Sequence, residues 1–145
     1  MSAEENKAIV RRFVEELDKG NLDVIDELLA PDFVDRSLLP GQEPDRESFK
    51  RSVAEMQAPF SNTKRTIDDQ VAEGDKVVSR YTIRGTHQGE EFFGVPATGE
   101  RIEMSGIQID HFEGGKIVEE RAEFDLLGAL QQLGAVPEPG QAQGA

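Results

Sequence analysis

The sequence predicts a single α+β domain in which a curved antiparallel sheet wraps around N-terminal helices. Residues 4–56 are dominated by helical periodicity, whereas residues 63–124 are dominated by the alternation of apolar and polar residues that is typical of strands. Such segregation is typical of helices packed on one face of an antiparallel sheet. A sheet that wraps helices leaves a cone with an open end, which is a natural site for a small-molecule pocket.

Composition limits the fold and the partners. The chain of 145 residues is long enough for one domain, assigned to residues 1–134, and the Pro-, Gly- and Gln-rich residues 135–145 are expected to be a disordered tail. The net charge of −13 argues against nucleic acid or an anionic membrane surface as partner, because both are bound through clustered Lys and Arg. No stretch approaches the ~20 apolar residues of a membrane span. With no cysteine and no signal-peptide core, we expect a cytoplasmic location.

Three helices are expected before the sheet. Residues 4–19 carry apolar side chains at the spacing of one helix face, and Gly20 suits the C-terminal cap. A short second helix ends before Pro31, and a third begins at Asp45, a suitable N-cap residue. The segment from Pro31 to Pro44 between these two helices is expected to be a loop.

Four strands and a final helix are expected to follow. The first strand is weakly patterned and is expected at or near an edge of the sheet. The sequence Glu113-Gly114-Gly115 suits a tight hairpin turn between the last two strands. Asp125 is expected to cap the final helix, and Gly134 to end it. The predicted strands are Thr63–Glu73, Lys76–His87, Arg101–Phe112 and Lys116–Phe124.

Alternation divides the predicted sheet into two faces, because successive side chains of a strand point in opposite directions. The face assigned to the helices is concave and mixes polar with apolar side chains. The convex face carries Ile107 and Ile109 among charged residues, and a small exposed apolar patch of this kind favours a homodimer contact. The concave set comprises Val77, Ser79, Tyr81, Ile83, His87, Ile102, Met104, Gly106, Gln108, Asp110, Phe112, Val118, Glu120, Ala122 and Phe124.

Three segments carry a resemblance to a known family. They are NKAIVRRFVEELDKGNLDVIDELLAPDFVD, GTHQGEEFFGVPATGERIE and GIQIDHFEGGKIVEERAEFDLLGALQQLG. From Asn6 to Gly134 the chain resembles the SnoaL-like polyketide cyclase and ester cyclase proteins of the nuclear transport factor 2-like superfamily. The resemblance implies a cone-shaped α+β fold, usually dimeric, with a hydrophobic cavity for a polycyclic or otherwise apolar ligand. It also implies ring closure by intramolecular aldol condensation, without a metal, cofactor or Schiff base.

The resemblance further implies where the site residues lie. In the cyclases an acidic residue on the last strand, after a His-Trp pair, serves as general acid/base. Polar residues on the neighbouring strand and after the second helix assist it. The helper after the second helix falls at Asp35, and the neighbouring-strand helpers fall near Gly106 and Gln108. The position of the acid falls at Ala122, so a methyl group stands where the cyclases keep their carboxylate.

Other side chains are candidates for proton transfer. Aldol closure needs a group with a pKa near the working pH, and burial raises the pKa of a carboxyl group toward that range. The available carboxylates are Glu120, Asp35 and Asp110, and Glu120 shares a strand face with Ala122. Each of these could instead be a hydrogen-bonded or solvated carboxylate near the rim of the predicted pocket. His87, at a strand end beside the glycine loop, is a further candidate acid/base, with a capping or turn role as the alternative.

The residues predicted to contact a ligand are Tyr81, Met104, Gln108, Asp110, Ala122, Phe124 and Phe93. Tyr81, the only tyrosine, suits either a hydrogen bond to a ligand carbonyl or an amphipathic core position. Phe92 and Phe93 lie on a predicted loop and suit either packing or a pocket lid. His87 and His111 lack the spacing of metal ligands, so no metal is expected.

Two functions from different classes stay open. The first is a cofactor-free enzyme, cyclase-like or isomerase-like, that acts on a small apolar carbonyl compound by acid/base catalysis in the pocket. The second is a non-catalytic ligand-binding or structural member of the same fold. Ala122 favours this second function, whereas the retained polar side chains of the inner face favour the first. An epoxide-hydrolase variant would need an inward-facing Asp-Arg-Asp set, and alternation points Arg121 outward, which disfavours that variant. In both remaining cases the expected partners are a small apolar molecule and a second copy of the chain.

Overall fold

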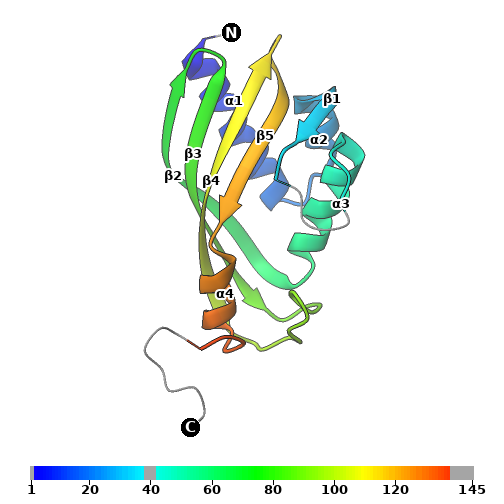
Figure 1. Cartoon of the computed structure of the whole chain (residues 1–145), viewed down its shortest axis with the longest axis vertical. Helices are drawn as coiled ribbons and strands as arrows, with labels where there is room; N and C mark the ends of the chain where they lie inside the picture. The colour runs from blue at the N-terminus through cyan, green and yellow to red at the C-terminus, as the bar shows by residue number, and fades with distance from the viewer. Residues whose placement is uncertain (1, 38–41, 138–145) are drawn as a thin grey trace.

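In the computed structural model, a five-stranded sheet curves around three helices that cover one of its faces (Figure 1). The structure describes residues 2–37 and 42–137. The strands lie in the order β1-β5-β4-β3-β2, so the first predicted strand, β2, is at an edge as expected. Their bounds are Leu29–Asp35 (β1), Phe60–Glu73 (β2), Lys76–His87 (β3), Arg101–Glu113 (β4) and Lys116–Phe124 (β5). The predicted α+β class is confirmed, with β2 beginning at Phe60 rather than Thr63.

The helices begin at caps that the sequence supplies. Ser2 and Glu5 exchange hydrogen bonds in a capping box that starts α1. The predicted N-cap Asp45 accepts a hydrogen bond from Ser48 N over 2.9 Å, and Asp125 caps α4 in the same way. The helices are Ala3–Asp18 (α1), Asp23–Leu28 (α2), Arg46–Gln57 (α3) and Leu126–Gln132 (α4). Of the predicted disordered tail 135–145, residues 138–145 lie outside the described residues.

The predicted loop between Pro31 and Pro44 is wrong in part, because strand β1 runs through Asp35. The strand pairs in parallel with β5, and this register sets Asp35 beside Glu120. Buried and exposed residues do not alternate along β1, so the sequence lacks the period of two that marks a strand. Proline donates no hydrogen bond to a neighbouring strand, and Pro31 is tolerated because β1 lies at the edge of the sheet.

Burial confirms the predicted faces of β3 and β4 and corrects that of β5. Every even-numbered residue from Ile102 to Phe112 is buried. A β-bulge between His111 and Phe112 shifts the pairing of β4 with β5. Ile117 is therefore fully buried, whereas Val118, predicted to face the helices, is only half-buried.

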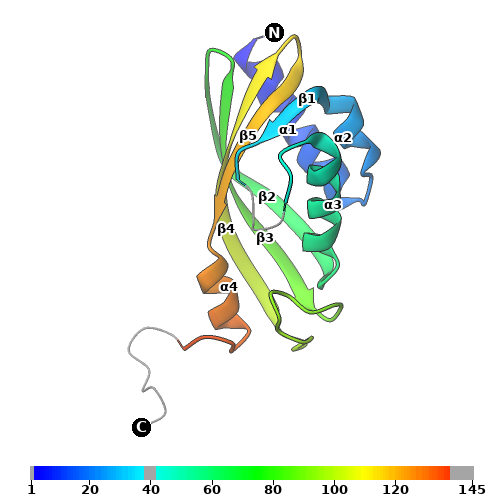
Figure 2. The ribbon, with the colours of Figure 1, turned by 45° about the vertical axis from the view of Figure 1, so that its right-hand side comes forward.

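The core forms two clusters near opposite ends of β4. The larger one joins α1, α2 and α3 to the sheet, and the smaller one lies around α4 and the loop before β4, at the lower end in Figure 2. The larger cluster contains Val10, Phe13, Leu17, Val24, Ile25, Leu28, Leu29, Phe33, Phe49, Val77, Phe112 and Ile117. The smaller contains Phe92, Ile102, Met104, Ala129 and Leu133. None of the helices in the described part of the chain is long and apolar enough to cross a membrane.

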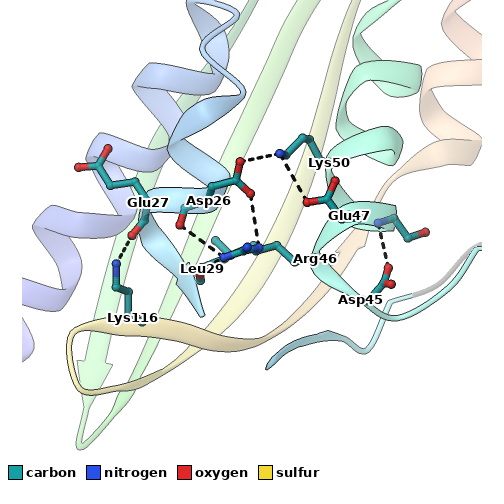
Figure 3. Close-up of polar contacts among 9 residues, drawn as sticks. Asp26, Glu27, Leu29, Asp45, Arg46, Glu47, Lys50 and Lys116 are labelled. Carbon is teal, nitrogen blue, oxygen red and sulfur yellow. Dashed lines mark hydrogen bonds and ion pairs between the residues drawn. The ribbon is translucent and has the colours of Figure 1, made fainter. Parts of the chain in front are cut away.

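Polar contacts tie α2, β1 and α3 together (Figure 3). Arg46, at the start of α3, donates through Nη1 to the Leu29 carbonyl over 3.2 Å, and its Nε lies 3.4 Å from Asp26 Oδ1. Lys50 Nζ lies 2.6 Å from the other oxygen of Asp26. These contacts hold the start of β1, the strand that carries Asp35, against α2 and α3.

Replacing Arg46 with methionine is expected to lower the free energy of unfolding by about 1–3 kcal/mol, because a charged donor to a part-buried carbonyl is lost. Methionine keeps the apolar stem but none of the donors, and urea unfolding measures the loss. The control is Arg84→Met, which breaks only the exposed 2.6 Å pair with Glu103. Exposed pairs contribute about 0–1 kcal/mol, so equal losses in the two variants would contradict the role given to Arg46.

Candidate functional site

A cavity of about 170 Å³ lies between the concave face of the sheet and helices α1 and α3. Its wall is mainly apolar, with side chains such as Phe13, Phe49 and Met104. Each of the five strands adds a polar side chain to this wall, and we call this set the polar arc. In the order of the strands across the sheet, the polar arc is Asp35 (β1), Glu120 (β5), Gln108 (β4), Tyr81 (β3) and Arg65 (β2).

Asp110 and Glu120 form a buried carboxyl pair at the centre of the sheet. They face each other on β4 and β5, with 0% and 7% of their surface exposed, and their side chains hydrogen-bond each other. Only Glu120 lines the cavity. Among the described residues, Asp110 Oδ1 and Glu120 Oε2 find no N–H or hydroxyl donor, so a proton held between the two carboxyl groups satisfies both.

Burial raises the pKa of both carboxyl groups in this pair. For Glu120 the pKa lies well above its usual value, first because of desolvation and then because of the charge of Asp110 and the hydrogen bond to it. Desolvation also raises the pKa of Asp110, although hydrogen bonds from Glu120 and Gln108 act in the opposite direction. We therefore place the shared proton on Glu120, which leaves Asp110 as the ionised member.

Gln108 connects the carboxyl pair to Arg65. The Gln108 amide donates through Nε2 to Asp110 Oδ2 over 2.8 Å, and its Oε1 accepts from Arg65 Nη1 over 3.3 Å. The positive charge of Arg65 opposes the rise in the pKa of both Asp110 and Glu120. The charge of the pair is thus balanced across the amide rather than by a direct ion pair.

Tyr81 lies flat over β4 because its neighbour there is Gly106. A Cβ at residue 106 would lie 2.5 Å from both Cζ and the hydroxyl oxygen of Tyr81. The other face of the ring is covered by Arg65, whose guanidinium carbon lies 4.4 Å from the ring centroid. Desolvation raises the pKa of Tyr81, so the phenol stays protonated. Its hydroxyl group has no hydrogen-bond partner among the described residues and is available to a ligand.

Gly106→Ala is expected to destabilise the protein by about 1–3 kcal/mol, because overpacking displaces the Tyr81 ring. The chain has one tyrosine and no tryptophan, so intrinsic fluorescence reports on Tyr81 alone. The expected result is a changed tyrosine emission in the folded state together with a lower urea midpoint. Ser105→Ala, which adds no bulk at the neighbouring exposed position, is the control. An unchanged emission in Gly106→Ala would contradict the packing of Tyr81 against β4.

Asp35 lies next to Glu120 through the β1–β5 pairing and lines the cavity. Desolvation raises its pKa, while a hydrogen bond from Ser37 N to Oδ1, 2.9 Å long, acts in the opposite direction. The Ser37 hydroxyl in turn accepts from Ala122 N–H, which anchors the end of β1 to β5. The position implied for a helper after the second helix is therefore adjacent to the buried acid.

The structure brings most of the predicted ligand contacts to one wall. Tyr81, Met104, Gln108, Ala122 and Phe124 line the cavity. Asp110 does not reach its surface and contacts the cavity only through Gln108 and Glu120. Phe93 is 47% exposed, and its ring packs on Phe92, 4.8 Å away, outside the cavity.

His87 is fully buried but does not line the cavity. Its Nδ1 lies 3.2 Å from Thr98 Oγ1, and its Nε2 lies 3.2 Å from the Glu90 carbonyl oxygen. The ring therefore holds the loop between β3 and β4 in place. This position matches the turn role of His87 rather than the acid/base role.

Arg65 is the site residue that sequence reasoning missed. Strand β2 has irregular pairing with β3 at residues 61–64 and 67–69, so its burial pattern does not alternate. The sequence offers only a weak signal, the shared parity of Arg65 with Thr63 and Ile67. Arg121, in contrast, is exposed on the convex face, as alternation predicts.

Comparisons with known proteins agree over nearly the whole chain. A model of the SnoaL-like polyketide cyclase family matches residues 7–133. Aklanonic acid methyl ester cyclase AcmA from Streptomyces galilaeus is 31% identical over 132 residues, which are 90% of this chain and 91% of AcmA. IdmH from Streptomyces antibioticus has a TM-score of 0.80 at 33% identity, covering 89% of this chain and 98% of IdmH. TsrD from Streptomyces laurentii has a TM-score of 0.84 at 28% identity, covering 94% of this chain and 99% of TsrD.

The family match and the fold lead to the same assignment. The matched residues include every strand and all four helices except the first turn of α1. The curved sheet around N-terminal helices is the arrangement that the resemblance implies. The chain is thus a member of the SnoaL-like polyketide cyclase family, with the nuclear transport factor 2-like fold.

Proposed function

We propose that the protein is a cofactor-independent enzyme that closes a ring by intramolecular aldol addition in a small β-dicarbonyl compound. One observation carries the proposal: Glu120, with a strongly raised pKa, lies beside the carboxylate of Asp35 on the wall of one cavity. Neighbouring acids that hold their protons to different extents are the requirement for acid–base catalysis. The relative AcmA is named as a cyclase, which supports ring closure as the class of reaction.

Proton transfer in this proposal is divided between two carboxyl groups. Asp35 takes the α-proton that lies between two carbonyl groups of the substrate, and the electron pair stays on the carbon as an enolate. The enolate carbon then attacks a ketone carbon of the same molecule, so one C–C bond forms and the C=O electron pair becomes an alkoxide. Glu120 protonates that alkoxide. The proton on Asp35 returns to Glu120, so substrate and product are isomers and no oxidant or reductant is needed.

The other polar groups support these two. Asp110 lies behind Glu120 and keeps its pKa high by negative charge. The free hydroxyl of Tyr81 is placed to donate a hydrogen bond to a substrate carbonyl. A cavity of about 150 Å³ holds benzene. The cavity of about 170 Å³ therefore suits roughly the one ring that is being closed, with any remaining part of a substrate outside it.

The test is turnover of aryl-tethered β-keto methyl esters that carry a ketone five or six atoms from the acidic carbon. The closed product has the mass of the substrate, so chromatography separates the two and NMR identifies the new C–C bond. The expected result is closure faster than in buffer and in the presence of heat-denatured protein. Binding of the probes without any closure would contradict the enzyme and support the second function.

The second function is a non-catalytic protein that binds a small apolar ligand in the same cavity. The specific observation that favours it is Ala122, which lines the cavity at the position where the resemblance implies a catalytic acid. In that case the carboxyl pair is a polar element of the sheet rather than a proton donor. Ligand affinity would then be unchanged by removing the acid function of Glu120.

We also propose that a second copy of the chain covers the convex face. Ile107 and Ile109 of β4 are 48% and 37% exposed there. The strand register sets Ile109 beside Val78, and Val78 beside the exposed Val71, so an apolar row crosses three strands. Light scattering at micromolar concentration should give twice the chain mass, and Ile109→Lys should give a monomer. A monomeric mass for the unmodified protein would refute the dimer.

A further inference from the structure

We propose that Arg65 is the anion-recognition group of the cavity and that it selects ligands presenting a planar, two-oxygen anion. Two chemical groups have this form, a carboxylate and the enolate of a β-dicarbonyl. The second of these rests on the proposed function, whereas the first does not. The cavity therefore selects ligands that are anionic or readily ionised as well as largely apolar.

In the part of the chain that the structure describes, the guanidinium of Arg65 has no carboxylate partner. It is the only Lys or Arg side chain among the described residues that line the cavity. Of the ion pairs within 4.0 Å in residues 2–37 and 42–137, none includes Arg65. One N–H of the guanidinium bonds to the neutral amide of Gln108. The remaining N–H groups lie in the cavity wall with no described acceptor.

The guanidinium is also held in a fixed orientation. Its central carbon lies 4.4 Å from the centroid of the Tyr81 ring, and that ring packs against the backbone of Gly106. The main-chain N–H of Arg65 donates to Asp18 Oδ2 over 2.9 Å, which fixes the strand against α1. A held guanidinium offers parallel N–H groups that match two oxygens in one plane, which a flexible ammonium group does not.

The nearby carboxyl groups offset the charge of Arg65 only from a distance, without direct contact with the guanidinium. Asp110 is reached only through the Gln108 amide, and Glu120 holds the proton of the carboxyl pair. Asp18 lines the cavity too, but its carboxylate accepts from the backbone N–H of Arg65 rather than from the guanidinium. Because no carboxylate of the described residues contacts the guanidinium directly, an anionic ligand in the cavity would supply the missing direct counterion. The net charge of −13 does not oppose this, because among the described residues no carboxylate oxygen lies within 4.0 Å of the guanidinium.

In the proposed reaction, the same contact stabilises the enolate. Negative charge that develops on the two oxygens of a β-dicarbonyl falls between the guanidinium of Arg65 and the hydroxyl of Tyr81. Donors fixed before the reaction favour the charged intermediate over the neutral ground state, because they need no reorientation as charge develops. Arg65 thus promotes removal of the α-proton by Asp35 without taking part in proton transfer.

The test measures binding rather than turnover, with two matched pairs of probes. Benzoate and benzamide differ in charge at nearly constant shape. The second pair is 2-acetylcyclohexane-1,3-dione, a dione that ionises readily to an anion with two oxygens on the same side, and neutral acetylcyclohexane. Calorimetric titration and tyrosine fluorescence give each affinity. We expect the anionic probe of each pair to bind more tightly than the neutral one. Arg65→Gln should lower the affinity for the anionic probe at least about tenfold and change the affinity for the neutral probe less than about twofold. Arg121→Gln, an exposed arginine on the convex face, should change neither.

The outcomes separate the sources of the anion. An effect on benzoate alone identifies a carboxylate, and an effect on the dione alone identifies the enolate; either supports the proposal. Arg65→Lys keeps the charge but not the planar donors, and it should lose part of the preference, so it decides the case if Arg65→Gln fails to fold. Equal weakening of anionic and neutral probes, or no preference in the unmodified protein, overturns the role of Arg65. Because no turnover is measured, failure of ring closure does not affect this result.

Discussion

Replacing Glu120 with glutamine is expected to lower kcat for ring closure by roughly 10²–10⁴-fold, with much less change in KM. The amide keeps the size of the side chain and can donate an N–H to Asp110, so the buried contact is preserved. It cannot give a proton to the alkoxide, however. Steady-state kinetics on the β-keto ester probe that shows the fastest closure measure the loss.

The pH profile separates loss of the acid from a change in packing. In the unmodified protein, kcat should rise as Asp35 ionises and fall where Glu120 loses its proton, at a pH well above the usual range for glutamic acid. Glu120→Gln should abolish the alkaline fall, and Asp35→Asn the acid rise. Glu119→Gln alters the next residue, which faces Arg36 across 3.0 Å, and should leave the profile unchanged. An alkaline fall that persists in Glu120→Gln would exclude Glu120 as the acid.

The same substitution is expected to stabilise the protein at neutral and alkaline pH. The folded state raises the pKa of Glu120 well above 4.5, so between the two values the native chain binds a proton that the unfolded chain has released. Stability therefore falls as the pH rises through that window. Glutamine has no such linkage. We expect Tm of Glu120→Gln to exceed that of the unmodified protein by a few degrees at pH 8, because ~1 kcal/mol shifts Tm by roughly 2–4 °C at this size.

Thermal unfolding at pH 4.5 and pH 8 checks this expectation. The difference in Tm between the two proteins should shrink toward the lower pH. Glu119→Gln is the control of opposite sign, because Arg36 lowers the pKa of Glu119 and stabilises the fold above the unfolded value. That variant should gain nothing at pH 8. A Glu120→Gln protein with the same Tm as the unmodified protein at pH 8 would mean that Glu120 is not desolvated.

The central strands could be predicted because each alternates without interruption. Gln108 and Asp110 have the same parity as Ile102 and Met104, and this parity alone predicts that both lie on the concave face. The errors occur where an irregularity breaks this period. The bulge at His111 reverses the faces at the start of β5, and the sequence carries no mark of it.

Strand β1 and Arg65 show two further limits. The parallel strand is defined by its pairing with β5, eighty residues or more away, rather than by its own pattern. Arg65 lies on an irregular edge strand, and its position over Tyr81 depends on an absent side chain at Gly106. Contacts of this kind arise from tertiary packing, so local periodicity does not reveal them. Asp110 and Glu120, by contrast, could be placed on the concave face because both lie on the side of the bulge where the strands alternate regularly.

The polar arc takes one residue from each strand, from Asp35 at one edge to Arg65 at the other. The complete set needs residues 35 to 120, and the parallel pairing of β1 with β5 joins Asp35, from the start of this range, to Glu120 at its end. Activity should therefore vanish in the same denaturant range as the global unfolding transition. Under the proposed function, ring closure would occur only when all five strands are assembled. A truncated or partly folded chain would have no activity.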